Sequence, residues 1–426
     1  MDDDSTDNLK PDNWPANQLP EKRQDWQRFA ASDREAGFEI TGDFKRFSQR
    51  NDMFNRVWWD KSIALKNVRE FYSGFRKMAS RKGDGFKQRD FALRNAAWVV
   101  AHSISERNRS LGLAEGFNDE MQPYRPKADE KMALSSPQET TAEIKKVAKL
   151  FGADLVGIAE YDERWVYSYK CDVKSREERP IDFSWGPTHV IVLGHAMDYD
   201  LIKAMPSALA GAAIGKGYSG ECATAMQLAQ YVLNLGFDAV ASMNDTALAI
   251  PYAIKAGLGE YGRNQMLITE EFGPRVRFSK IFTNLPLSPD KPRRFGVREF
   301  CDICSRCADA CPVKAIPYGP PSDQGPNQSS IKGVKKWTAD CEKCFGYWTK
   351  MKTDCSICMR ECPFNKDFSK WSLRLARKLA ATPLRKLLLK LDTRLGWGKR
   401  VAPKDWWGNE GGLAEQFAGE EADKEK

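Results

Sequence analysis

Apolar residues recur along the middle of the chain with two different periods. Between residues 137 and 151 they fall three and four positions apart, which is typical of a helix that buries one face. Ser136 and Glu139 have the order of a capping box, with a proline between them at the first helical position, and Gly152 follows the last apolar residue. The sequence therefore predicts a helix over 137–151.

Short apolar runs after this helix predict buried strands. They lie at 154–160, 189–194, 238–242, 265–269 and 276–282, and a helix is expected over 220–235, ended by Gly236. Strands that alternate with helices indicate the α/β class. We expect a polar extension at 1–45, a helical and aromatic part at 46–135, an α/β core at 136–295, a cysteine module at 296–366 and a basic tail at 367–426.

The composition of the chain is that of a globular protein without a membrane-spanning segment. The chain has 426 residues, a net charge of +8 and 42% hydrophobic residues, which is enough for a sizeable core and does not require nucleic acid as a partner. No apolar run is long enough to cross a membrane. The acidic, polar start has no basic and apolar leader, so we expect a cytoplasmic protein as written.

The cysteines are concentrated in one segment. Nine of the eleven lie between 301 and 362, whereas disulfide scaffolds are small and spread their cysteines along the chain. The run Cys301–Cys311 has the spacing C-x2-C-x2-C-x3-C-P, in which three thiolates hold one [4Fe–4S] cluster and the fourth reaches to another. A second run, C-x2-C-x3-C-P, spans 355–362.

Reciprocity between the two runs predicts the ligands of two [4Fe–4S] clusters. Cluster 1 takes Cys301, Cys304, Cys307 and Cys362, and cluster 2 takes Cys311, Cys355, Cys358 and one further cysteine. Cys341 and Cys344 compete for that last place, and we prefer Cys344 because it is nearer to Cys355 in sequence. Zinc is the alternative, but two runs that both end in Cys-Pro favour iron–sulfur clusters. Clusters alone do not say where the electrons go, and the large core before them indicates an acceptor site.

Several motifs resemble those of corrinoid-dependent reductive dehalogenases, which are related to epoxyqueuosine reductase. They are "FKRFSQRNDMFNRVWWD", "RDFALRNAAWVV", "GADLVGIAEYDERWVYS", the stretch at 250–292 and the two cysteine runs, so that the resemblance covers about residues 44–365. It implies a nitroreductase-like core that binds a corrinoid such as cobalamin, fed by a bacterial-ferredoxin-like dicluster module. The implied reaction replaces a carbon–halogen bond of an organohalide by C–H at a Co(I) corrinoid, with two electrons and one proton.

The resemblance also implies three catalytic residues. A tyrosine, an asparagine and an arginine of the family match Tyr218, Asn244 and Arg277 in this sequence. Tyr218 would give the proton, Arg277 would stabilise the phenolate that remains, and Asn244 would position the substrate or the phenol. Taken singly, Tyr218 is more typical of a packing residue and Arg277 of a surface charge, and it is their order and motif context that favour the catalytic interpretation.

Other residues bear on the cofactor and the pocket. The motif D-x-H-x-x-G, which supplies a histidine to cobalt, is absent, so the corrinoid is expected base-off, as in the family, and His189 and His195 as core residues. "GLGEYG" at 257–262 does not follow a strand and is expected to be a tight turn rather than a nicotinamide site. Trp59, Trp98 and Trp348 are candidates for an apolar substrate pocket, or otherwise for the core.

Alternatives remain for function, partners and location. The chain could be an epoxyqueuosine reductase acting on tRNA, or a non-catalytic dicluster electron-transfer protein. As a dehalogenase it needs a small organohalide and an electron donor such as a ferredoxin, a flavodoxin or a membrane redox chain. If a twin-arginine leader is missing, it would lie on the outer face of the cytoplasmic membrane with a small membrane-anchor protein. The amphipathic basic tail, broken by Pro383, is expected to pack its apolar side on the core.

Overall fold

A four-stranded antiparallel sheet forms the centre of the α/β part. The computed structural model describes residues 26–63, 65–75, 83–113, 119–175, 177–244 and 246–408. The sheet has the order β1-β4-β8-β5. Its strands are β1 (Leu155–Glu160), β4 (His189–Ala196), β8 (Val276–Thr283) and β5 (Ala239–Ser242). Because β4 and β8 pair over their full length, these two strands fix the register of the sheet.

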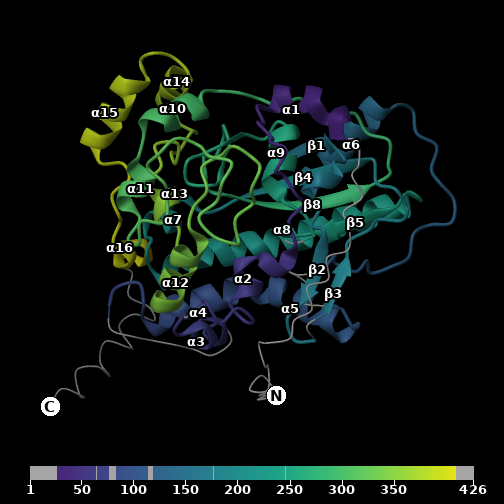
Figure 1. Cartoon of the computed structure of the whole chain (residues 1–426), viewed down its shortest axis with the longest axis horizontal. Helices are drawn as coiled ribbons and strands as arrows, with labels where there is room; N and C mark the ends of the chain where they lie inside the picture. The colour runs from purple at the N-terminus through teal and green to yellow at the C-terminus, as the bar shows by residue number, and fades with distance from the viewer. Residues whose placement is uncertain are drawn as a thin grey trace.

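Alternating side chains of the sheet face two separate apolar layers. On β4, Ile191 and Leu193 belong to one cluster of buried residues, and Val190 and Val192 belong to another. This is the period of two that a strand imposes when both of its faces are buried. Helices α8 (Ala208–Asn234) and α6 (Pro137–Leu150) cover the first face, and α9 (Ala249–Lys255) and aromatic residues of the N-terminal segment cover the second (Figure 1).

Shorter elements surround this core. The N-terminal half contains η3 (Trp26–Phe29), α1 (Ala30–Ala36), η4 (Gln49–Asn51), α2 (Met53–Arg56), α3 (Val68–Ser73), α4 (Gln88–Ala97) and α5 (Val99–Ser110). The α/β part adds η5 (Glu163–Trp165), β2 (Tyr169–Asp172), β3 (Glu177–Pro180), α7 (Tyr199–Lys203), β6 (Glu260–Tyr261) and β7 (Leu267–Ile268). The C-terminal part holds α10 (Val297–Ile303), α11 (Arg306–Ala310), α12 (Cys341–Met351), α13 (Ile357–Arg360), α14 (Trp371–Leu379), α15 (Arg385–Leu395) and α16 (Pro403–Trp407).

Several elements expected from the sequence are present, and the mixed α/β class is confirmed. The Ser136 hydroxyl caps α6 by accepting the Glu139 N–H at 3.2 Å. The strands expected at 154–160, 189–194, 238–242 and 276–282 correspond to β1, β4, β5 and β8. At "GLGEYG", the chain turns at Gly257, whose φ of +72° favours glycine.

Two expectations about the elements were wrong. The helix expected over 220–235 begins twelve residues earlier, at Ala208, because its first half is a run of Ala and Gly without an apolar stripe. The strand expected over 265–269 is the short β7, which pairs only with β6 outside the main sheet. Of the polar extension expected at 1–45, the described part contains η3 and α1. Residues 1–25, and 409–426 of the tail, are outside the described residues.

The basic tail departs furthest from its expected packing. It forms α14 and α15, which Pro383 separates as expected. Leu388 and Leu389 pack on a buried cluster, but five apolar residues of the two helices are exposed: Trp371, Leu375, Leu387, Leu391 and Leu395. Helix α14 has no buried residue, and Asp392 is the one that α15 buries. Within the described part of the chain, no helix has the length and apolar character needed to cross a bilayer.

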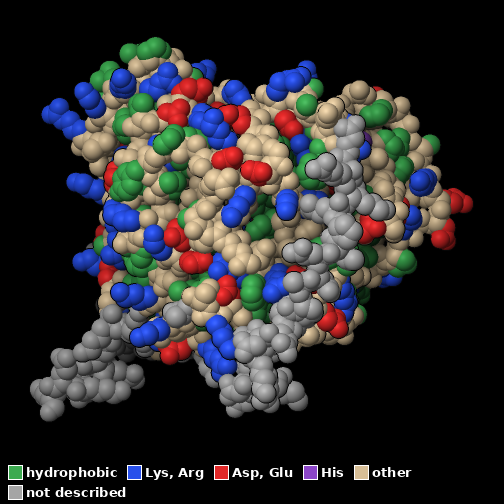
Figure 2. All heavy atoms as spheres, in the orientation of Figure 1, with side chains coloured by type: hydrophobic (Ala, Val, Ile, Leu, Met, Phe, Trp, Pro, Cys, Tyr) green, Lys and Arg blue, Asp and Glu red, His purple; other side chains and the backbone are tan. Residues whose placement is uncertain are grey.

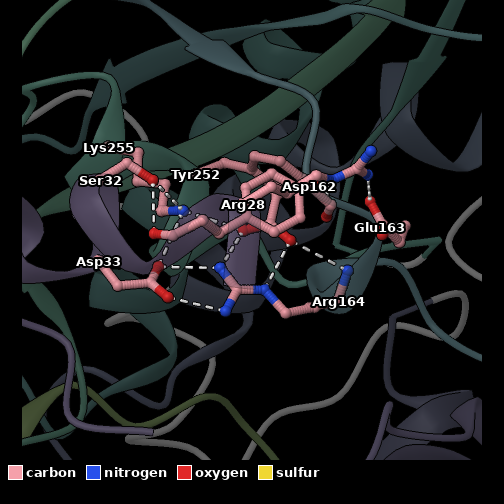
Figure 3. Close-up of polar contacts among 9 residues, drawn as sticks. Arg28, Ser32, Asp33, Asp162, Glu163, Arg164, Tyr252 and Lys255 are labelled. Carbon is pink, nitrogen blue, oxygen red and sulfur yellow. Dashed lines mark hydrogen bonds and ion pairs between the residues drawn. The ribbon is translucent and has the colours of Figure 1, made fainter. Parts of the chain in front are cut away.

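A buried network of charges ties the N-terminal segment to the core (Figure 3). The Arg164 guanidinium donates two hydrogen bonds to Asp33 of α1, at 2.7 and 2.8 Å, and two more to Asp162. Lys255 of α9 lies 2.9 Å from Asp162 and 3.0 Å from Asp33. Burial raises the pKa of the Asp162 carboxyl, but Arg164 and Lys255 outweigh it and lower that pKa overall. The network therefore holds α1, and the residues that follow it, against the sheet.

We predict that Asp33→Asn will lower the free energy of unfolding by about 2 kcal/mol, because the buried Arg164 loses one of its two carboxylate partners. The shift of the urea midpoint measures this loss. Glu177→Gln is the matched control, since Glu177 pairs with Arg179 on the surface and should leave the midpoint unchanged. Equal shifts for the two variants would contradict a structural role for the network.

Candidate functional site: a buried tyrosine beside a large cavity

Glycines of α8 allow two large side chains to lie directly against the helix. A Cβ at Gly215 would meet Trp98 Cδ1 at 2.4 Å, and one at Gly217 would meet Arg277 Cγ at 2.7 Å. Trp98 comes from the junction of α4 and α5, and Arg277 from the face of β8 that α8 covers. Because of these two glycines, side chains from parts of the chain that are far apart in sequence can contact Tyr218, the residue after Gly217.

Tyr218 is held between an indole ring and a guanidinium. The Trp98 ring stacks on it with centroids 4.6 Å apart and planes at 26°. The Arg277 guanidinium carbon lies 3.7 Å from the centroid of the phenol ring, a cation–π contact. The side chain of Tyr218 is nine-tenths buried, with 9% of its surface exposed. Its ring can therefore neither rotate away nor become fully hydrated.

Asn244 joins Tyr218 to Arg277. The Asn244 amide nitrogen donates to the Tyr218 hydroxyl oxygen, and its carbonyl oxygen accepts from Arg277 Nη2 at 2.9 Å. The structure thus brings together the three residues that the sequence resemblance selected. Since the phenol oxygen accepts the bond from Asn244, the hydroxyl proton is not used in that bond.

Burial decides the protonation state of the tyrosine. It raises the pKa of Tyr218 to about 12, although Arg277 and the Asn244 hydrogen bond act in the opposite direction. The arginine stabilises the phenolate as expected, but desolvation is the larger effect. Tyr218 therefore keeps its proton at neutral pH and gives it up only to a strong base that forms next to it.

The three residues line a cavity of about 840 Å³. This is near the upper end of the range for ligand sites in proteins. Its wall also includes Trp58, Phe71, Tyr72, Phe75, Trp98, His102, Met266, Leu267 and Trp348. Residues 36–38, at the end of α1 and directly after it, form another part of the wall. The network of Figure 3 therefore contributes to the shape of this cavity.

Of the three tryptophans proposed for a pocket, two line the cavity. Trp98 and Trp348 do so, but Trp59 does not, and its neighbour Trp58 takes that place. The Trp59 indole donates to the Arg50 carbonyl at 3.0 Å, and the Arg50 guanidinium covers its ring at 4.4 Å. Adjacent residues of a helical turn point in different directions, which the sequence "VWW" could not resolve.

The cysteines of the C-terminal part form two groups. Cys301, Cys304 and Cys362 share one apolar cluster. Burial raises the pKa of Cys307 to about 12, and the charges of Cys301 and Cys304 raise it further. We call Cys301, Cys304, Cys307 and Cys362 the outer group.

The inner group is made of Cys311, Cys344, Cys355 and Cys358. Burial raises the pKa of Cys358, and the charges of the other three members, together with that of Cys307, raise it further. Cys355 and the preceding Asp354 line the cavity. The inner group therefore stands between the outer group and the cavity.

Cys341 and Cys344 differ in their surroundings. Burial raises the pKa of Cys344 to about 12, with further contributions from Cys355 and Cys311 of the inner group. The Cys341 thiol instead donates to Asn327 Oδ1 at 3.4 Å. It also lines the cavity. Cys344 is thus the better placed to complete a set of four thiolates.

The histidines expected in the core are placed as follows. His195 is buried, and its Nε2 lies 3.1 Å from Thr224 Oγ1. Burial lowers its pKa to about 4, so it is neutral at physiological pH. His189 is half-buried at the start of β4. Neither lines the cavity, where His102 is the histidine of the described wall.

Two buried carboxyl groups near the site were missed in the sequence. Glu221 lies one helical turn after Tyr218 and has no exposed surface, and among the described residues neither of its oxygens has a hydrogen-bond partner. Burial raises its pKa to about 7, against the effects of Arg277 and Lys280. Burial likewise raises the pKa of Asp354 to about 6. The one available signal for Glu221 was a lone acidic residue within a helix of mostly small and apolar residues.

Comparisons with known proteins agree with this arrangement. Residues 300–365 match the family model of a 4Fe-4S double cluster binding domain. Tetrachloroethene reductive dehalogenase of Desulfitobacterium hafniense is 36% identical over 330 residues, which cover 65% of this chain and 59% of that protein. The chain thus spans about three-fifths of the length of such relatives. The resemblance to reductive dehalogenases seen in the sequence is confirmed.

The chain is also similar to a solved structure and to a second family of enzymes. A solved structure of a reductive dehalogenase, described as suggesting a mechanism for B12-dependent dehalogenation, has a TM-score of 0.68 and 22% identity. The match covers 85% of this chain and 48% of that one, and it supports the same fold. Epoxyqueuosine reductase of Lactococcus garvieae is 29% identical over 142 residues, or 29% of this chain and 34% of that protein.

We predict that Glu221→Gln will change how stability depends on pH. With a pKa of about 7 in the fold, the carboxyl keeps a proton that the unfolded chain releases above about pH 4.3. Its contribution to stability is therefore complete below that pH and is lost as the pH rises towards 7. Between pH 5 and 7.5, wild type should lose on the order of 2 kcal/mol relative to the variant in urea unfolding. A difference that stays constant with pH would show that Glu221 titrates normally.

Proposed function

We propose that this chain is a reductive dehalogenase that uses a corrinoid such as cobalamin and two [4Fe–4S] clusters to replace the halogen of a small organohalide by hydrogen. The observation that carries the proposal is the hydrogen-bonded set of the buried Tyr218 with Asn244 and Arg277, on the wall of a cavity that Cys355 also lines. The relatives named above support the same reaction class. The nitroreductase-like description of the core and the ferredoxin-like description of the cysteine module belong to this proposal.

The cavity fits a corrinoid in size and in chemistry. A large apolar wall suits the faces of the macrocycle, and basic residues on another part of the wall suit an anionic tail. These residues are Arg293, Arg294, Arg298, Lys335 and Lys336. His195 is buried in the core away from the wall, and the ring of His102, which does line the cavity, is stacked on Trp98. The proposal therefore keeps the corrinoid base-off. When bound, the corrinoid would supply a strong reductant at its cobalt.

The residues around Tyr218 would supply the proton and exclude water. Replacement of a carbon–halogen bond by C–H takes two electrons and one proton and releases a halide ion. With a pKa of about 12, Tyr218 stays protonated until a basic carbon centre forms next to it. Arg277 and Asn244 would then stabilise the phenolate, and the stacked Trp98 keeps the ring in place.

The two groups of cysteines would hold the clusters. We assign the outer group to cluster 1 and the inner group to cluster 2. Thiols with strongly raised pKa values in close contact can all be deprotonated when they ligate metal, because the iron stabilises the thiolates. Since Cys355 of the inner group lines the cavity, electrons would enter at cluster 1 and reach the cavity through cluster 2.

We predict that Tyr218→Phe will reduce turnover by about 10²-fold or more, because the general acid is lost while ring stacking is kept. The chain is reconstituted anaerobically with iron, sulfide and cobalamin. Iron and cobalt are counted, and halide release from bromophenols, chlorophenols and chloroethenes is assayed with reduced viologen. The variant should bind iron and cobalt like the wild type.

Tyr231→Phe is the matched control for this experiment. It removes a hydroxyl from the same helix, where Tyr231 donates to Glu143 at the surface, and activity should be unchanged. Retained activity in Tyr218→Phe would refute the role of the tyrosine. Iron without cobalt would leave a dicluster electron carrier, and cobalt without halide release would direct the search to tRNA substrates.

We also predict that the two competing cysteines will differ when replaced. Cys344→Ala should lower the iron content from about eight to about four per chain and remove the signal of one cluster in electron paramagnetic resonance. Cys341→Ala should retain both clusters, because that thiol hydrogen bonds to Asn327. The opposite result would exchange their roles.

A further inference from the structure

The exposed sides of α14 and α15 carry regular rows of apolar and basic side chains. In α15, Leu387, Leu391 and Leu395 are 54%, 45% and 56% exposed and form one row at spacings of four. Lys386, Lys390 and Arg394 form a parallel exposed row next to them. Such rows follow from the four-residue repeat of a helix surface.

Helix α14 repeats the same arrangement. Trp371 and Leu375 are 72% and 54% exposed, and Arg374 and Lys378 are exposed beside them. Across residues 371–395 the chain has seven Lys and Arg and a single acidic residue. Figure 2 shows the green and blue side chains together over these two helices at the upper left. We call this surface the α14–α15 face.

The opposite sides of the same helices cover the outer cysteine group. Leu388 and Leu389 pack against the buried cluster that contains Cys301, Cys304 and Cys362. A Cβ at Gly296, which precedes α10, would lie 2.4 Å from the Cα of Ala381 in the connection between α14 and α15. In Figure 1, α14 and α15 lie next to α10 on the side of the molecule away from the sheet.

A buried charge fixes α15 in this position. Asp392, 5% exposed, lies 2.7 Å from Lys366 Nζ and also pairs with Arg306. Arg306 and Lys366 belong to the cysteine module. The positive charge of Arg306 favours the thiolate form of Cys304, and that of Lys366 favours the thiolate form of Cys362. The α14–α15 face is therefore a preformed surface that is attached to the outer group.

We infer that the α14–α15 face is the docking surface for a small acidic one-electron carrier protein, which reduces the cluster of the outer group. The inference rests on the proposed function in that the outer group must hold a cluster. The carrier gives up one electron and is oxidised, and the cluster accepts it. Two such encounters supply the two electrons of each turnover.

Charge and location both favour this occupant. Electron transfer weakens steeply with distance, so the donor must approach the outer group, and the α14–α15 face lies directly over it. A basic rim around a few apolar side chains attracts an acidic partner through long-range steering, and redox encounters use small interfaces. An anionic membrane would recognise similar residues, and the experiment separates the two.

The test uses the full chain reconstituted with iron, sulfide and cobalamin, and reduced flavodoxin as the acidic carrier. Stopped-flow absorbance of the clusters gives the second-order rate constant of reduction without any organohalide. In wild type this constant should fall as sodium chloride is added. In Lys386→Glu/Lys390→Glu it should be lower by about 10-fold or more at low salt and should lose that salt dependence.

Matched variants on another exposed helix provide the control. Lys146→Glu/Lys149→Glu makes the same change of charge on α6, beside Leu150, which is 79% exposed. It should leave the rate constant close to that of wild type. Leu387→Ala/Leu391→Ala should lower the rate constant several-fold but retain its salt dependence, whereas Leu150→Ala should not. Full reduction of every variant by dithionite verifies that the clusters are intact.

Equal rate constants for wild type and Lys386→Glu/Lys390→Glu would overturn the inference. So would a variant that loses binding to phosphatidylglycerol vesicles but is reduced by flavodoxin at the normal rate, because the surface would then bind a membrane. The failure of the proposed function looks different: the clusters would be reduced normally, but no halide would be released. A chain that takes up no iron would contradict both.

Discussion

The close approach of Trp98 and Arg277 to the bare backbone of α8 is the contact on which the site depends. Neither side chain could reach Tyr218 if Gly215 and Gly217 carried a Cβ. Glycine inside a helix costs about 1 kcal/mol relative to alanine. The cost is offset by burial, because α8 also forms the centre of the largest apolar cluster. The site is therefore built on a rigid element rather than on a loop.

Low solvation around this contact explains the protonation of the site. Tyr218, Glu221 and Asp354 all have pKa values that burial raises, even though Arg277 opposes that shift at each of them. The half-buried Arg277 guanidinium thus lowers the pKa of three acidic groups, and none of them is paired with it exclusively. Tyr218 therefore keeps its proton at neutral pH, whereas Glu221, with a pKa of about 7, and Asp354, with a pKa of about 6, titrate close to neutrality. Acids of this kind suit a reaction that consumes a proton.

The proposed route of the electrons passes through successive parts of the molecule. The α14–α15 face lies over the outer cysteine group, the inner group comes next, and the cavity with Tyr218 follows. Ion pairs of Asp392 connect the first two layers, and the Arg164 network fixes the N-terminal segment that closes part of the cavity. A buried charge destabilises the fold unless it is fully paired. In this chain the paired buried charges, those of Asp392 and of Arg164, lie where a long segment must be held in one position.

Local spacing in the sequence determined the elements that depend on near neighbours, and it predicted the cluster ligands. Examples are the cysteine runs, the cap of α6 at Ser136 and the apolar strands. They can be predicted because the residues that interact, or that share a face, lie a fixed small number of positions apart in the sequence. Tertiary structure decided the rest. It placed Trp58 rather than Trp59 on the cavity wall, exposed the leucines of α15, and raised the pKa of Glu221. Each of these depends on what packs against the residue from a distant part of the chain, and burial by a distant partner leaves no periodic signal in the sequence.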